Sequence, residues 1–330
     1  MKKISLIFPV YNVAECVKES LLSALEQSYP NIEYLIIDDK GTDNSMEIVN
    51  DIIDNHSRKA SVRIIEHQRN RGYGGTGNTG IQEATGEYIF FLDSDDILLS
   101  NAIDLLVRLL DEDDYDMIAA SFERIVNNVK ESIYLPDKVL VGQDEILTTY
   151  LNKKSCYEMI WGKLYNLSCL KNNNLKFIES CNHEDPPFTF NLMLNLKKVR
   201  LSSSIIYQWI FRNGSTTSVY REKNVLDLYL GFNYLTNILQ KYSENKNYAI
   251  MLSYVNNFRL FPIWLLLKNV VVVSNKKHLL INFTTPLLSF NDILRLPLSY
   301  SERVKHIIFL LPQRIKLLVL YLVSYTQKIN

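Results

Sequence analysis

Acidic residues gather at two points of the chain where a short apolar run has just ended. The run YIFFL at 88–92 is followed by Asp93, Ser94, Asp95 and Asp96, and LII at 35–37 is followed by Asp38 and Asp39. Carboxylates this close together repel one another unless a cation neutralises them. Mn²⁺ or Mg²⁺ takes such oxygen ligands, often shares them with substrate phosphates, and can stabilise a departing diphosphate as a Lewis acid. The alternative is that Asp93–Asp96 are solvated loop acids that cap a helix at Asn101.

A glycine-rich segment, GYGGTG at 72–77, formally matches the G-x-G-x-x-G pattern of dinucleotide-binding folds and raises the alternative of a nicotinamide or flavin oxidoreductase. That turn is tight and normally follows the first strand. Here polar residues 67–71 precede the glycines, and the expected strand before them is the third. A phosphatase with an aspartyl nucleophile would carry its acidic motif after the first strand, where this chain has PVYN at 9–12. We therefore disfavour both alternatives.

The elements that must position these residues alternate along the first part of the chain. Apolar runs predict strands at 4–8, 32–37, 62–65 and 88–92, and helical spacing predicts helices at 17–25 and from 45 to 53. The glycine-rich residues 72–80 are expected to form a loop that leads into another helix. This alternation predicts an α/β fold with a doubly wound, largely parallel sheet. Ligands bind beyond the carboxyl ends of such strands, where residues 9–12, 38–39 and 93–95 would converge.

Charge is unevenly distributed in this 330-residue chain, although its formal net charge is zero and suggests no nucleic-acid partner. Residues 258–330 hold ten basic and two acidic residues, interleaved with apolar runs at 261–267, 307–311 and 315–323. Basic amphipathic helices bind anionic lipid surfaces. We expect this region to contact the cytoplasmic face of a membrane peripherally; the alternative is packing on the catalytic domain or a homo-oligomer contact. Prolines and charges argue against a spanning helix.

Single residues give weaker signals. Cysteines 16, 156, 169 and 181 show no C-x-x-C spacing and are interpreted as reduced thiols of a cytoplasmic protein. The apolar run near the N-terminus is too short for a signal peptide and is expected to be a strand. Histidines 56, 67, 278 and 306 show no ligand spacing and are expected at the surface.

Several motifs, taken in order, resemble glycosyltransferase family 2. The blocks ISLIFPVYN (4–12), LIIDD (35–39) with GTDNS (41–45), NTG (78–80) and GEYIFFLDSDD (86–96) resemble its first four blocks. WGKLY (161–165), HED (183–185) and RNGS (212–215) are similar to its acceptor-side blocks. The ordered set covers roughly residues 1–216, while 217–330 match nothing we would name.

This resemblance implies a GT-A fold, that is, a Rossmann-like doubly wound mixed sheet, here with a C-terminal mainly helical extension. Residues 1–216 would bind the nucleotide sugar and catalyse transfer, and 217–330 would form the helical region. The implied activity is inverting transfer of one sugar from a nucleotide-sugar donor, expected to be UDP-linked. The acceptor would be a glycan or lipid-linked molecule in bacterial-type surface polysaccharide synthesis. The Gln-x-x-Arg-Trp pattern of processive members is absent. The alternative is a non-catalytic nucleotide-sugar-binding protein.

The resemblance also implies roles for individual residues. Pro9, Tyr11 and Asp39 would contact the donor base, Asp93 the ribose or metal, and Asp95 the metal. The donor side would be completed by Asn12, Asn70, Gly72, Asn78 and Ser94. Asp185 is similar to the catalytic base that takes the proton of the attacking hydroxyl; the alternative for Glu184 and Asp185 is the acidic first turn of a helix running to Leu196. Acceptor or phosphate contacts are expected from Lys163, His183, Glu184, Arg212 and Ser215.

One position departs from the family pattern. Many members have an arginine directly before the Asn-x-Gly of the third block, and this chain has Gly77 there. A cation near the pyrophosphate is therefore either missing or supplied by Arg71, Lys163 or Arg212.

Overall fold

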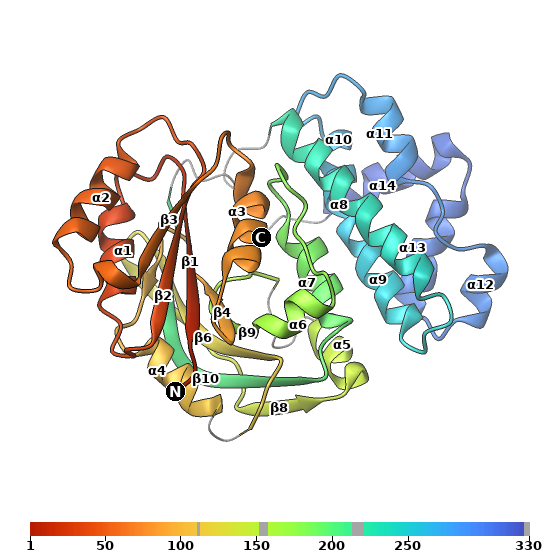
Figure 1. The fold of residues 1–330 in the computed structure, drawn as a ribbon. Coiled ribbons are helices and arrows are strands. Elements are labelled where there is room, and N and C mark those ends of the chain that lie inside the picture. Colours follow the sequence, from red (N-terminus) through yellow and green to blue (C-terminus); the bar gives the residue numbers. More distant parts are fainter. Residues whose placement is uncertain (111–112, 152–157, 213–220, 327–330) are drawn as a thin grey trace. The chain divides into compact units, whose positions relative to one another are not determined.

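Four parallel strands form the first half of the central sheet in a computed structural model, which describes residues 1–110, 113–151, 158–212 and 221–326 (Figure 1). These strands are β1 (Ile4–Val10), β2 (Ile32–Asp38), β3 (Val62–Glu66) and β4 (Tyr88–Phe91). They lie in the order β3-β2-β1-β4. β1 and β2 are buried at nearly every position, as expected for parallel strands covered on both faces.

The sheet continues as a mixed sheet in the order β9-β6-β10-β5. β9 (Lys163–Asn166) runs antiparallel to both β4 and β6 (Met117–Val126), and β10 (Lys198–Ile210) runs parallel to β6. β5 (Ile97–Leu98) and β8 (Lys138–Val141) pair with β10, and β7 (Val129–Ile133) pairs with β6. The predicted doubly wound sheet is therefore confirmed, and its second half is mixed rather than parallel.

Helices cover both faces of this sheet (Figure 1). α1 (Val17–Leu25), α2 (Ser45–Asn55) and α4 (Ala102–Leu110) share one buried apolar cluster with alternate residues of β1. α3 (Gly72–Glu83) packs on the opposite face, where Gly80 meets the side chain of Ile7. The remaining elements of this part are η1 (Lys59–Ser61), α5 (Gln143–Leu151), α6 (Leu167–Asn172) and α7 (Asp185–Met193).

The glycine-rich segment is helical, which corrects the expectation of a loop over residues 72–80. α3 begins at Gly72, and at its other glycines a Cβ would stand closer than 3.0 Å to a neighbouring atom. A Cβ would stand 2.3 Å from the Ile178 carbonyl oxygen at Gly74, and 2.7 Å from the Phe177 ring at Gly77. Close packing of this helix outweighs the low helix propensity of glycine. Because the glycines form no tight turn after β1, the oxidoreductase alternative loses its support.

Contacts divide the chain into two compact units, Met1–Ser215 and Thr216–Asn330. In the described part of the second unit, every element is a helix. These helices are α8 (Glu222–Lys241), α9 (Tyr248–Phe258), α10 (Leu260–Leu267), α11 (Lys276–Phe283), α12 (Phe290–Arg295), α13 (Tyr300–Leu310) and α14 (Gln313–Thr326).

A buried arginine stands in the core of the second unit. Arg259 is fully buried between α9 and α10, and its Nη1 donates to the carbonyl oxygens of Phe283 (3.2 Å) and Thr285 (2.6 Å). Burial lowers the pKa of Arg259 to about 9. Among the described residues, one helical stretch, Tyr248–Leu267, is long and apolar enough to cross a membrane, but 61% of its most apolar window is buried. The apolar run 261–267 therefore belongs to the core of this unit.

Candidate active site

The acidic cluster directly follows β4, and its three carboxylates have different surroundings. Ligand oxygens of Asp93, Asp95 and Asp96 lie within 4.8 Å of one another, a spacing that can hold a metal ion. Asp96 accepts hydrogen bonds from the Tyr207 hydroxyl and the Ile210 backbone N–H, both at 2.8 Å. Asp96 is thus engaged with β10, whereas Asp93 and Asp95 are better placed to receive a ligand.

Electrostatics in the cluster favour a bound cation. Burial, followed by the charge of Asp95, raises the pKa of Asp93 to about 8. Burial also raises the pKa of Asp95, although the charge of Arg212 opposes this shift. Nη2 of Arg212 donates to the Asp95 carbonyl oxygen at 2.8 Å. An oxygen-only donor set that resists ionisation on its own fits Mg²⁺ or Mn²⁺, which would favour the ionised carboxylates.

Asp185 is the first residue of α7 and lies near this cluster. Its charge contributes to raising the pKa values of Asp93 and of Tyr73. Burial, followed by the charge of Glu184, raises the pKa of Asp185 well above its ordinary range, while the charge of Lys163 opposes the shift. Lys163 is buried at the start of β9 and donates to the Met159 carbonyl oxygen. The fold thus brings together acidic residues far apart in sequence.

Residues assigned to the donor side lie around the carboxyl ends of the parallel strands. Pro9 is in β1, and Tyr11, just after it, has an exposed ring, the residue being 47% exposed. Asn12 has a positive φ of 52°, and its Oδ1 accepts from the Thr42 N–H at 2.7 Å. Asn70 is exposed after β3, and Ser94 is buried after β4. This edge therefore presents an exposed aromatic ring and polar groups.

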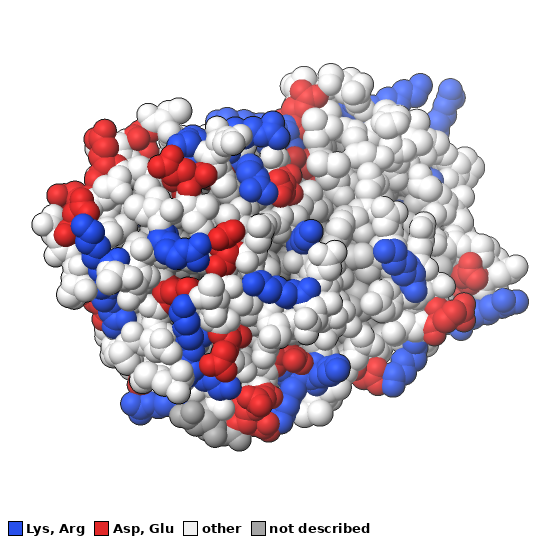
Figure 2. All heavy atoms as spheres, in the orientation of Figure 1, with Lys and Arg blue, Asp and Glu red and all other residues white. Residues whose placement is uncertain are grey.

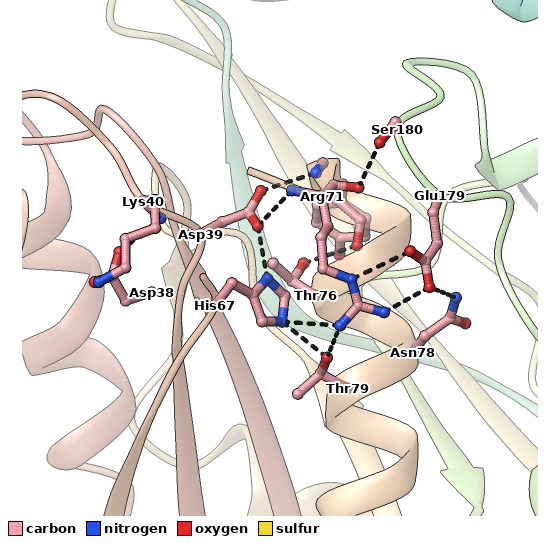
Figure 3. Close-up of polar contacts among 12 residues, drawn as sticks. Asp38, Asp39, Lys40, His67, Arg71, Thr76, Asn78, Thr79, Glu179 and Ser180 are labelled. Carbon is pink, nitrogen blue, oxygen red and sulfur yellow. Dashed lines mark hydrogen bonds and ion pairs between the residues drawn. The ribbon is translucent and has the colours of Figure 1, made fainter. Parts of the chain in front are cut away.

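Asp39 is only 2% exposed and is held by three hydrogen bonds (Figure 3). Its Oδ1 accepts from the Arg71 N–H at 2.8 Å and contacts His67 Nδ1 at 2.7 Å, and its Oδ2 accepts from the Gly72 N–H at 2.9 Å. A carboxylate offers about four acceptor positions. One position on Oδ2 is therefore left for a ligand.

Two histidines expected at the surface are buried, and this expectation was wrong for both. His67 is 6% exposed and links Asp39 to the Thr79 hydroxyl, which its Nε2 contacts at 2.8 Å. His306 is 2% exposed in the second unit. The signal that His67 carried was its place, one residue after β3, at the same sheet edge as Asp39.

The other expected residues have varied surroundings. Asn78 uses its side-chain amide on the backbone of Phe177, accepting at 2.8 Å and donating at 3.1 Å. The Arg71 guanidinium, a candidate for the missing cation, pairs with Glu179 at 2.6 Å. His183 and Glu184 directly precede α7. Ser215 lies outside the described residues.

The fold and the site together define a GT-A glycosyltransferase. Residues 5–167 match the sequence profile described as "Glycosyl transferase family 2". An uncharacterised glycosyltransferase of Haemophilus influenzae is 33% identical over 192 residues, which cover 55% of this chain and 72% of the relative. YibD of Escherichia coli, also an uncharacterised glycosyltransferase, is 29% identical over 255 residues, covering 75% and 72%. The chain belongs to glycosyltransferase family 2.

Solved structures share the fold. Staphylococcus aureus TarS 1–349, crystallised with UDP-GlcNAc, superposes with a TM-score of 0.69 at 24% identity, covering 95% of this chain and 90% of that one. TarS is a poly(ribitol-phosphate) β-N-acetylglucosaminyltransferase, and the sequence of this chain is 27% identical to that of TarS over 214 residues. The match spans 63% of this chain but only 35% of TarS. A mannosyltransferase of Pyrobaculum calidifontis, solved with GDP-Man and Mn²⁺, has a TM-score of 0.51 at 15% identity. The predicted GT-A class is therefore confirmed.

Proposed function

We propose that this protein is an inverting, metal-assisted glycosyltransferase that adds one sugar from a UDP-linked donor to a glycan or lipid-linked acceptor in surface polysaccharide synthesis. The observation that carries the proposal is the cluster of Asp93, Asp95 and Asp96 after β4, whose ligand oxygens lie within 4.8 Å of one another, in a chain of glycosyltransferase family 2. Inversion needs a base on one side of the sugar and stabilisation of the leaving diphosphate on the other. TarS, which acts on poly(ribitol phosphate) and was crystallised with UDP-GlcNAc, supports the UDP donor and the polymeric acceptor.

On the leaving-group side, Asp95 and Asp93 would hold Mn²⁺ or Mg²⁺. When bound, the ion would act as a Lewis acid on the diphosphate. Arg212, bonded to the Asp95 carbonyl oxygen, would add positive charge nearby. Asp96 would keep the loop in place through its bonds to β10.

On the acceptor side, Asp185 would take the proton of the attacking hydroxyl. Burial raises the pKa of Asp185, which makes its carboxylate a stronger base than an exposed one. The charge of Lys163 favours the ionised form that a base requires. His183, Glu184 and Ser215 would contact the acceptor.

The donor would lie along the carboxyl ends of β1, β2 and β4. The exposed ring of Tyr11 could stack on the base, as aromatic side chains do with flat ligands, and Pro9 would flank it. The remaining acceptor position of Asp39 would receive an N–H of the base. Asn12, Asn70, Gly72, Asn78 and Ser94 would complete this side, directly or through the loops that they hold.

We further propose that the second unit contacts the cytoplasmic face of an anionic membrane through α13 and α14. Exposed apolar residues recur on single helix faces, Tyr300, Val304 and Ile307 on α13, and Ile315, Leu318 and Leu322 on α14. On the face shown in Figure 2, uncharged residues cover most of the surface over the C-terminal helices.

Only part of the positive charge of this region is available to lipid. Arg259 and Lys316 are buried, and Arg303 donates to backbone carbonyl oxygens at the end of α12, whereas Arg295 and Arg314 are exposed. We expect co-sedimentation with anionic vesicles at low salt, release at high salt, and weaker binding by Leu318→Glu. Point variants are preferable to truncation, because ending the chain near residue 257 would remove the buried Arg259. Full-length protein that ignores anionic vesicles at low salt contradicts this location, and a concentration-dependent dimer would assign the face to a second copy.

Release of nucleoside diphosphate tests the function. The protein would be incubated with UDP-sugars, Mn²⁺ and polyol-phosphate or glycan acceptors, and UDP would be measured. Acceptor-dependent UDP release is the expected result. Binding of UDP-sugar without release, with any acceptor, would favour the non-catalytic binding protein instead.

A further inference from the structure

A short segment at 177–180, just ahead of the His183–Asp185 motif, is fastened to the first turns of α3 (Figure 3). The Asn78 amide holds both backbone polar groups of Phe177, and the Ser180 N–H donates to the Arg71 carbonyl oxygen at 2.8 Å. The Arg71 guanidinium donates two hydrogen bonds to the Glu179 carboxylate, Nε to Oε2 at 3.1 Å and Nη2 to Oε1 at 2.6 Å. Two parallel bonds of this kind fix direction as well as distance.

The same arginine is tied to Asp39 through a chain of hydrogen bonds. A carboxylate only accepts, so His67 Nδ1 carries the proton that is donated to Asp39 Oδ1. His67 Nε2 then accepts from the Thr79 hydroxyl, whose oxygen accepts from Arg71 Nη1 at 3.1 Å. Arg71, Thr79 and His67 each have a hydrogen-bond partner in this chain, and the backbone N–H of Arg71 also binds Asp39. The place of the guanidinium is therefore set from the donor side.

Segment 177–180 in turn packs against the helix that carries Asp185. The Phe177 ring stacks on Phe188 of α7, with ring centroids 3.7 Å apart and an interplanar angle of 4°. The other side of the segment has no freedom toward α3, because the Ile178 carbonyl and the Phe177 ring occupy the space over Gly74 and Gly77. A shift of 177–180 against α3 would therefore also move the start of α7.

We propose that Arg71 and Glu179 are a positioning pair that sets the proposed base Asp185 relative to a donor bound at Asp39. The proposal rests on the proposed function. Neither side chain need touch the reacting atoms, since the pair acts through segment 177–180. Misplacement of a catalytic group by about 1 Å can cost on the order of 100-fold in rate. The loss of this pair should therefore appear in turnover rather than in donor binding.

The test compares Glu179→Gln, Arg71→Met and the double variant with wild type, using full-length protein, UDP-sugar and acceptor. We expect each single variant to lower kcat on the order of tenfold, with KM for the donor changed less than about twofold. The ratio of sugar transfer to donor hydrolysis should also fall, because water is less sensitive than an acceptor to the place of the base. The double variant should be no worse than the poorer single variant, since each single change already removes the Arg71–Glu179 ion pair.

A matched control exists at the other end of α3. Arg63 and Glu83 form an ion pair of similar exposure, with Nη2 to Oε2 at 2.9 Å, that holds α3 to β3. Glu83→Gln should leave kcat and the transfer ratio at wild-type values. If Glu179→Gln behaves like Glu83→Gln, or if donor affinity falls in step with kcat, the positioning role is wrong. If wild-type protein releases no UDP while it binds the donor, the proposed function fails instead, so the two failures are distinguishable.

Discussion

The pKa of Asp93 makes the stability of the metal-free protein depend on pH in an unusual direction. Its native pKa of about 8 lies above its ordinary value of 3.8, so between these values the folded chain binds more protons than the unfolded chain. Stability from this group is fully present below pH 3.8 and is lost as pH rises through about 8. Metal-free protein should therefore become less stable from mildly acidic to mildly alkaline pH, where most carboxylates have the opposite or no effect.

The size of the effect follows from the two pKa values. At about 1.4 kcal/mol per pKa unit, the full difference corresponds to an upper bound of roughly 5 to 6 kcal/mol. Asp93 is only partly buried, at the edge of the sheet, and solvent screening should reduce the observed loss to about 2–3 kcal/mol. For a chain of this size this corresponds to a fall in the thermal midpoint of roughly 3–4 °C.

Differential scanning calorimetry in excess EDTA, over a pH series at constant ionic strength, measures this fall directly. Saturating Mn²⁺ should flatten the pH dependence and raise the midpoint most at alkaline pH, since the cation stabilises the ionised cluster. Asp93→Asn serves as the control: it should show a smaller alkaline loss than wild type, the remainder coming from Asp95 and Asp185, whose pKa values are also raised, and a weaker response to Mn²⁺. A midpoint in EDTA that stays level or rises toward pH 8, in wild type and Asp93→Asn alike, would refute the reasoning.

Three further substitutions test the site and the packing. Asp95→Ala should abolish UDP release, because the diphosphate loses its Lewis acid, and it should leave the thermal midpoint nearly unchanged; full activity of this variant in excess EDTA would contradict the assignment. Asp185→Asn should keep donor affinity by calorimetry and lower transfer roughly 10²–10⁴-fold, since an amide cannot accept the proton; an equal loss of affinity and transfer would make Asp185 structural or donor-side. Gly77→Arg should cost about 1–3 kcal/mol in a denaturant titration, because its Cβ would stand 2.7 Å from the Phe177 ring; an undiminished midpoint would show that Phe177 can move aside.

Local pattern alone was enough to predict the class of fold and the strand ends at which the candidate site is expected. The apolar runs of β1, β2 and β4 and the polar residues that follow them are encoded over a few neighbouring residues, so strand ends and the acidic cluster are visible in sequence. The carboxyl ends of parallel strands lie at one edge of the sheet, so the sequence predicts that Tyr11, Asp39 and Asp93 lie near one another.

Tertiary contacts decided the surroundings and hydrogen-bond partners of these groups. Asp93 and Asp96 are close in sequence and of the same residue type, yet only the Asp96 carboxylate accepts from the Tyr207 hydroxyl and the Ile210 N–H, because β10 passes beside it. Asp93 contacts the Tyr207 hydroxyl through its backbone N–H instead. The low helix propensity of glycine predicts a loop over the α3 glycines. They form a helix because Phe177 and Ile178 pack closely against it, in the space that larger side chains would need. His67 is buried rather than exposed because Asp39 and Thr79, distant in sequence, satisfy both of its nitrogens. Each outcome depends on a partner far along the chain. The pattern of neighbouring residues in the sequence does not reveal the free energy of such a contact.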